Sequence, residues 1–214
     1  QFDGIRVIRF YNKTRRFRYP AGFLNIPNIL LLKKKLFELA PDIVHIQHLI
    51  HFSPLVIALL NQMKIPFVMT LHDYWLLCDK IFLIDREKRS CEGSNLKNCL
   101  NCLLLDNYLK LPYLGFFHYL RKKIFYLVND RKILFLSSSK NLIEKVRKEF
   151  PLTEYFFLPL CSPSPKTGSI KKNAKTVFLY TGGENEIKGY SLLKLLLKKN
   201  GRKDFILHNY GGKI

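Results

Sequence analysis

A histidine and an aspartate, His72 and Asp73, follow directly after an apolar run at residues 65–71 that is typical of a buried strand. A neutral imidazole can hydrogen-bond a hydroxyl group, and ligands of open α/β sheets bind beyond the carboxyl ends of the strands. We therefore predict a catalytic site at these two residues. The alternative is a histidine satisfied by neighbouring backbone. His45 and His48, on or beside a second buried strand, are expected to be structural.

The loop at residues 181–189 is the second candidate site, because it contains Gly182, Gly183 and Lys188. Glycines let backbone amides approach an oxyanion, and the helix that follows offers its positive end. The lysine adds a full charge. These features predict a phosphate-binding loop, but glycines in such a loop can also serve a steric purpose alone.

Four cysteines form the third candidate: Cys78, Cys91, Cys99 and Cys102. The last two make a Cys-x-x-Cys pair, in which two intervening residues let both thiolates bind one zinc ion tetrahedrally. We predict a structural zinc that braces an insertion at residues 78–103. Catalytic zinc is not expected, because four thiolates leave no open position for water. Two disulfides or free thiols remain alternatives, although a reducing cytosol disfavours disulfides.

Strand and helix patterns that position these residues alternate along the chain. We expect strands at 4–11, 43–47, 65–71, 133–136, 155–160, 176–181 and 204–208, and helices at 28–39, 53–63, 141–150 and 190–199. Short joins between strand, helix and strand indicate parallel pairs. The predicted fold class is α/β, with a Rossmann-like parallel-sheet domain that is incomplete at its N-terminus, followed by the beginning of a second Rossmann-like domain.

Turn-forming residues with little apolar content indicate a linker at residues 161–175. The first domain is therefore placed at 1–160 and the second at 176–214. The chain begins without a methionine and stops directly after a predicted strand and a glycine turn. We expect it to be a fragment or trimmed region of a longer protein.

The formal net charge of +20 on 214 residues implies a negatively charged partner. Nucleic acid, anionic lipid headgroups and phosphorylated small molecules all fit, and a soluble basic surface is the alternative. Polar residues interrupt the uncharged stretch at 43–63, which excludes a membrane span there. No signal pattern is visible, so we expect a cytoplasmic protein. The stretch at 108–128 favours a core helix with a basic edge over a helix on an anionic membrane.

Four segments together resemble glycosyltransferase family 4, whose members have the two-domain GT-B fold: residues 41–48, 70–78, 137–140 and 178–189. Their order and spacing are more specific than any one of them. The resemblance implies a nucleotide-diphosphate-sugar donor and a glycan or lipid-linked acceptor. It also implies retention at the anomeric carbon and no cofactor for catalysis.

The resemblance also assigns roles to residues. His72, with Asp73, is expected near the reacting sugar, and Gly182, Gly183 and Lys188 are expected at the donor diphosphate. Many relatives carry an arginine where this chain has Gly183, which leaves the diphosphate one fewer cation. The family's glycine-rich loop and paired-glutamate motif are expected beyond the two ends of this sequence. The fragment itself is therefore expected to be inactive.

Two other classes of function remain. A basic four-cysteine protein that binds nucleic acid would show steep salt dependence. That class is disfavoured because no known nucleic-acid module is present and the glycine loop goes unexplained. A noncatalytic glycosyltransferase remnant is the other class, and Gly183 and the missing motifs favour it.

Overall fold

The structure is a computed structural model that describes residues 4–10, 25–49, 52–78, 80–85, 87–93, 98–99, 102, 120, 122–126, 133–161, 175–184, 186–200 and 205–209. The chain forms two compact units, Gln1–Cys161 and Ser162–Ile214, and each is considered by itself. Most of the predicted linker lies outside the described residues.

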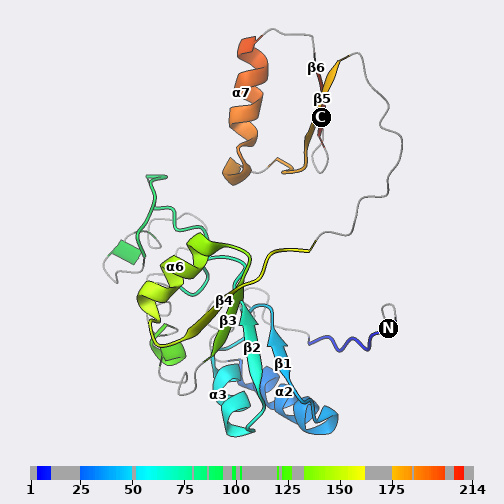
Figure 1. Cartoon of the computed structure of the whole chain (residues 1–214), viewed down its shortest axis with the longest axis vertical. Coiled ribbons are helices and arrows are strands. Elements are labelled where there is room, and N and C mark those ends of the chain that lie inside the picture. The colour runs from blue at the N-terminus through cyan, green and yellow to red at the C-terminus, as the bar shows by residue number, and fades with distance from the viewer. Residues whose placement is uncertain are drawn as a thin grey trace. The chain divides into compact units, whose positions relative to one another are not determined.

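Four parallel strands form the sheet of the first unit (Figure 1). They are β1 (Val44–Ile46), β2 (Phe67–Thr70), β3 (Leu134–Ser137) and β4 (Glu154–Phe157), and they lie in the order β1-β2-β3-β4. Every neighbouring pair is parallel, with β1 beside β2, β2 beside β3 and β3 beside β4. The predicted α/β class with a Rossmann-like parallel sheet is confirmed.

Helix α2 (Ile26–Leu39) has defined start and stop signals. The side chain of Asn25 accepts a hydrogen bond from the amide of Asn28 and so satisfies one of the unpaired donors of the first turn. At the other end, Ala40 takes a left-handed conformation with φ of 42°, and Pro41 cannot continue the helix.

Serines precede two further helices. The Ser53 hydroxyl accepts from the amide of Leu55, but the N-cap residue of α3 (Leu55–Gln62) is Pro54. Ser139 caps α6 (Lys140–Glu149) by accepting from the amide of Leu142. Helix α6 packs against β3 and β4 and buries one stripe of its surface: Leu142, Ile143 and Val146.

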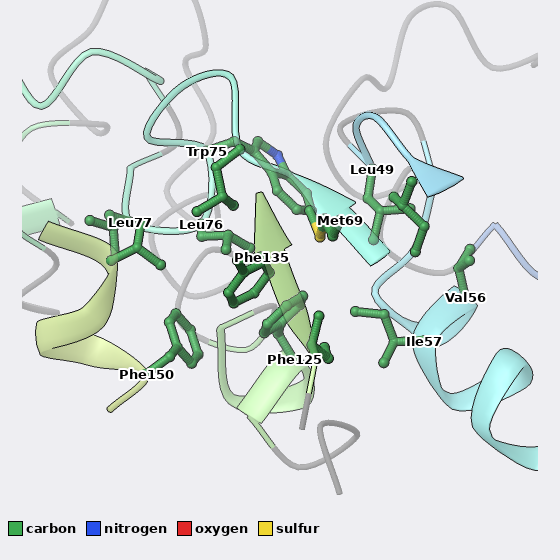
Figure 2. Close-up of a cluster of buried hydrophobic side chains, with 14 of the residues drawn as sticks. Leu49, Val56, Ile57, Met69, Trp75, Leu76, Leu77, Phe125, Phe135 and Phe150 are labelled. Carbon is green, nitrogen blue, oxygen red and sulfur yellow. The ribbon is translucent and has the colours of Figure 1, made fainter. Parts of the chain in front are cut away.

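Aromatic side chains from three segments meet in the core of this unit (Figure 2). Phe125 stacks on Phe135 of β3 with ring centroids 6.2 Å apart, and it meets Phe150 edge to face at 5.3 Å. Phe125 belongs to the stretch at 108–128, most of which lies outside the described residues. Its described part packs into the core and leaves Lys123 exposed.

The strand expected at residues 4–11 is not formed over the described residues 4–10, where Ile5 alone makes a bridge. Ile5 and Val7 are instead more than half exposed. A strand persists only where a neighbour completes its backbone hydrogen bonds. Among the described strands of this unit, β1 forms one edge of the sheet and is paired with β2.

The second unit contains one strand-helix-strand element. Its parts are β5 (Thr176–Tyr180), the short 3₁₀ helix η1 (Glu186–Lys188), α7 (Tyr190–Asn200) and β6 (Phe205–Asn209), with β5 and β6 parallel. Within the residues that the structure describes in either unit, no helix has the length and apolar character needed to span a bilayer.

Truncating a core aromatic is expected to destabilise the first unit strongly. Phe135 is fully buried, so Phe135→Ala removes its contacts and leaves a cavity that costs about 3–5 kcal/mol. Urea denaturation followed by the fluorescence of Trp75, the single and buried tryptophan, measures the change. The control is Phe37→Ala on the surface of α2, where the ring is 82% exposed, with an expected change within about 0.5 kcal/mol. Equal losses in the two variants would contradict this core.

Candidate functional site

A row of polar side chains lies at the carboxyl ends of β1 and β2. Successive residues of a strand point to opposite faces of the sheet, so residues two apart share a face. The parallel register places His45 beside Val68 and Ile46 beside Met69. It therefore puts four polar residues on the same face: His45, Gln47, Thr70 and His72.

The opposite face of the same strand ends is core. Ile46, Met69 and Leu71 are each less than 10% exposed. The buried hydroxyl of Ser137 donates to the carbonyl of Leu71 at 3.1 Å, and the Leu71 amide donates to Leu136 at 2.7 Å. These bonds hold the chain in place just before His72.

Side-chain hydrogen bonds join the four residues, which we call the polar row. His72 Nε2 lies 2.7 Å from Gln47 Oε1, and Gln47 Nε2 lies 3.1 Å from His45 Nε2. His45 Nε2 in turn lies 2.7 Å from the hydroxyl of Thr70. The side chains of His45, Gln47 and His72 are exposed, so the row can meet a ligand.

Asp73 has different partners from His72. Its carboxylate lies 3.2 Å from His48 Nε2 and accepts a hydrogen bond from the amide of Trp75 at 2.8 Å. The His48 ring also lies against the Trp75 ring, with centroids 5.3 Å apart. Trp75 belongs to the hydrophobic cluster drawn in Figure 2, so Asp73 ties the turn after β2 to the core.

The environment of Asp73 stabilises its charged form. Burial acts to raise the pKa of this carboxyl, but hydrogen bonds from His48 and from the Trp75 amide act in the opposite direction. The nearby imidazoles of His48 and His72 add to that effect, and the pKa of Asp73 lies below its ordinary value. The carboxylate is therefore ionised at neutral pH.

The structure places both His72 and Asp73 beyond the carboxyl end of β2, as predicted. It also shows two contacts of these residues that the sequence did not predict. Gln47 with His72, and His48 with Asp73, are each 25 residues apart in the chain. Their pairing depends on the register of two strands. Aligning the carboxyl ends of the two apolar runs would have given an estimate of that register. Such an estimate could have predicted these two pairs.

Backbone conformation and close packing account for the glycines in the loop of the second unit. Gly183 and Gly189 have φ of 62° and 79°, which glycine adopts without strain. A side chain at Gly182 would collide with the Tyr180 ring, whose hydroxyl donates to the carbonyl of Lys188. Lys188 is exposed at the end of η1, directly before α7.

Two of the cysteines lie at the core of the first unit. Cys78 and Cys91 pack against the core, and the thiol of Cys91 donates to the carbonyl of Gly93. All five cysteines of the chain lie in the described residues, and no disulfide joins them there. In the part of the chain that the structure describes, no group of three or more His, Cys, Asp or Glu side chains is placed to hold a metal ion. The zinc site stays a prediction.

Comparison with known proteins gives one result. The family model described as Glycosyltransferase Family 4 matches residues 2–154, which covers most of the chain, including β1, β2 and β3, and ends at the first residue of β4. No curated protein and no solved structure matches the chain.

Removing the Asp73 charge is expected to change how stability depends on pH. Because the folded pKa is lowered, the stabilisation is fully present above the ordinary value of 3.8 and is lost as pH falls through the folded pKa. Asp73→Asn should therefore lower the free energy of unfolding at neutral pH by about 1–2 kcal/mol, since hydrogen bonds to a charged group are weakened. The deficit should shrink below about pH 4.

Urea denaturation across this pH range measures both curves. Asp42→Asn is the matched control, because Asp42 is an exposed carboxylate just before β1. A deficit for Asp73→Asn that stays the same from neutral pH to pH 3 would show that charge is not the cause.

Metal analysis of protein purified without chelators tests the zinc prediction. About one zinc ion per chain is expected for the wild type, with loss in Cys99→Ser, because each thiolate of a four-cysteine site is needed for tight binding. Cys161→Ser is the control, since Cys161 is exposed and outside the predicted site. Wild-type protein without zinc would dismiss the site.

Proposed function

We propose a sugar-transfer reaction for this chain, which belongs to glycosyltransferase family 4. Membership of the family makes it a glycosyltransferase-like protein, with a sugar donor and an acceptor as its general partners. In the proposed reaction, a nucleotide-diphosphate sugar gives its sugar to the acceptor with retention of anomeric configuration. The exposed polar row at the carboxyl ends of β1 and β2 carries the proposal, because α/β sheets bind ligands there.

His72 is the proposed catalytic residue on the acceptor side. Its ring is exposed beyond β2 and hydrogen-bonds the side chain of Gln47. A neutral imidazole in this position can accept a hydrogen bond from an acceptor hydroxyl and orient it for attack. Asp73 supports this role by fixing the turn through His48 and Trp75.

The glycine loop is the proposed binding site for the donor diphosphate. Lys188 offers an exposed ammonium group, and the first amides of α7 follow directly. A helix N-terminus attracts anions through its unpaired amides and its dipole. Preorganised groups of this kind stabilise the negative charge that develops on a departing diphosphate. No cofactor enters the proposed reaction.

The acceptor is proposed to be a glycan or a lipid-linked glycan, as in the synthesis of polysaccharides. The net charge of +20 supports reversible contact with an anionic membrane surface, where a lipid-linked acceptor would be held. We propose the cytoplasmic face of a membrane as the site of action. Release of the protein from anionic vesicles by salt would support this contact.

Removing the Lys188 ammonium is expected to weaken donor binding. A panel of nucleotide-diphosphate sugars is screened by thermal stabilisation, and the best one is titrated against wild type and Lys188→Ala by calorimetry. We expect the dissociation constant of the variant to rise about tenfold or more, which corresponds to about 1.4 kcal/mol for a lost charge-assisted contact.

Lys198→Ala serves as the matched control, since Lys198 is another exposed lysine of α7. Its dissociation constant should equal that of the wild type. Equal affinities in all three proteins would remove the proposed phosphate site. Failure of every nucleotide sugar to bind the wild type would favour the noncatalytic alternative.

A further inference from the structure

Gln47 lies between two imidazole rings in the polar row. Its Oε1 is 2.7 Å from His72 Nε2, and its Nε2 is 3.1 Å from His45 Nε2 and 3.3 Å from His45 Nδ1. Gln47 follows β1 directly, whereas His72 lies beyond β2. A single side chain thus connects the end of one strand with the proposed catalytic residue of the next.

The chemistry of an amide fixes the direction of these bonds. A carbonyl oxygen can only accept, so the contact with Gln47 Oε1 requires a proton on His72 Nε2. A neutral imidazole carries one ring proton, so Nδ1 of His72 then has the lone pair. The contact selects one tautomer of the ring and also restricts its orientation.

The other end of Gln47 is anchored in the same way. The amide NH₂ group can only donate, so a nitrogen of His45 must accept. Both ring nitrogens of His45 lie within reach of that group, Nε2 at 3.1 Å and Nδ1 at 3.3 Å. The Thr70 hydroxyl, 2.7 Å from Nε2, can donate or accept and so complements either choice. In this orientation of the amide, Oε1 faces the His72 ring and the NH₂ group faces the His45 ring.

We propose that Gln47 is a positioning residue that holds His72 with Nε2 protonated, so that Nδ1 presents a lone pair to the hydroxyl of the acceptor. This inference rests on the proposed function of His72. It extends that function by naming which ring nitrogen meets the acceptor and which side chain sets it.

An amide suits this task better than a carboxylate. A carboxylate beside His72 would favour the charged imidazolium, which has no lone pair with which to accept a hydroxyl proton. Asp73, the carboxylate closest in sequence, makes its hydrogen bonds to His48 and the Trp75 amide instead. Asp73 thus hydrogen-bonds His48, whereas His72 hydrogen-bonds the neutral amide of Gln47 and interacts with the Asp73 charge only at longer range.

Ring-nitrogen NMR shifts of the histidines test the inference without requiring activity. Spectra are recorded at a pH where the rings are neutral, and His72 is assigned by its loss in His72→Ala. We expect wild type to show His72 almost entirely as the Nε2-protonated tautomer. Gln47→Leu should show a mixture, whereas Gln47→Glu retains an oxygen acceptor and should keep Nε2 protonated. Gln62→Leu, an exposed glutamine at the end of α3, is the matched control and should match wild type.

Steady-state kinetics of the complete protein, which includes the motifs expected beyond the two ends of this sequence, supply the second measurement. Gln47→Leu is expected to lower kcat by about tenfold to a hundredfold and to leave KM for the donor unchanged, because misorienting a group at the reacting hydroxyl costs rate rather than donor binding. A wild-type spectrum with mixed tautomers, or with Nδ1 protonated, would overturn the inference whether or not sugar is transferred. The expected spectra in a protein that transfers no sugar would support the positioning role and overturn the proposed function.

Discussion

The parallel register between β1 and β2 is the constraint on which the candidate site depends. Strand side chains alternate between faces, so a slip of one residue would bury the polar row and expose its apolar neighbours. Burying a large apolar side chain stabilises a fold by about 1.5–3 kcal/mol, whereas a hydrogen bond contributes a net 0.5–1.5 kcal/mol. Ile46, Met69 and Leu71, all buried, therefore set the register. The contact of Gln47 with His72 follows from it.

The two imidazoles of His48 and His72, at the carboxyl ends of β1 and β2, have hydrogen-bond partners of different charge. The first pair contributes to stability, and the second is suited to binding a ligand. His48 faces an ionised carboxylate whose other hydrogen bond reaches the amide of Trp75, so this pair holds the turn against the core. His72 faces the amide of Gln47 in an exposed position. A neutral partner orients a ring without supplying the charge that would favour its protonated form. Asp73 thus makes the contacts that stabilise the turn, whereas the exposed ring of His72 can contact a ligand.

Hydrophobic periodicity was sufficient to predict the strands of the first sheet, their parallel pairing and the helices α2, α3 and α6, since each has a strong local pattern or cap. It also located His72 and Asp73 beyond a strand. It could not give the pairing of Gln47 with His72, because that contact is determined by register between segments 25 residues apart. The strand expected at residues 4–11 was wrong for a similar reason: alternation describes one segment, whereas a strand also needs a neighbour.

The glycines of the second unit show how backbone geometry limits what a loop motif implies. Gly182 leaves room for the Tyr180 ring, and Gly183 has φ of 62°, so both glycines have conformational reasons that are independent of any ligand. An arginine at position 183 would have to adopt this left-handed conformation at a cost of about 1–2 kcal/mol. A second cation at this position would therefore oppose the loop's present backbone. The electrostatic part of any anion binding by this loop then rests on Lys188 and on the first amides of α7, rather than on the number of glycines.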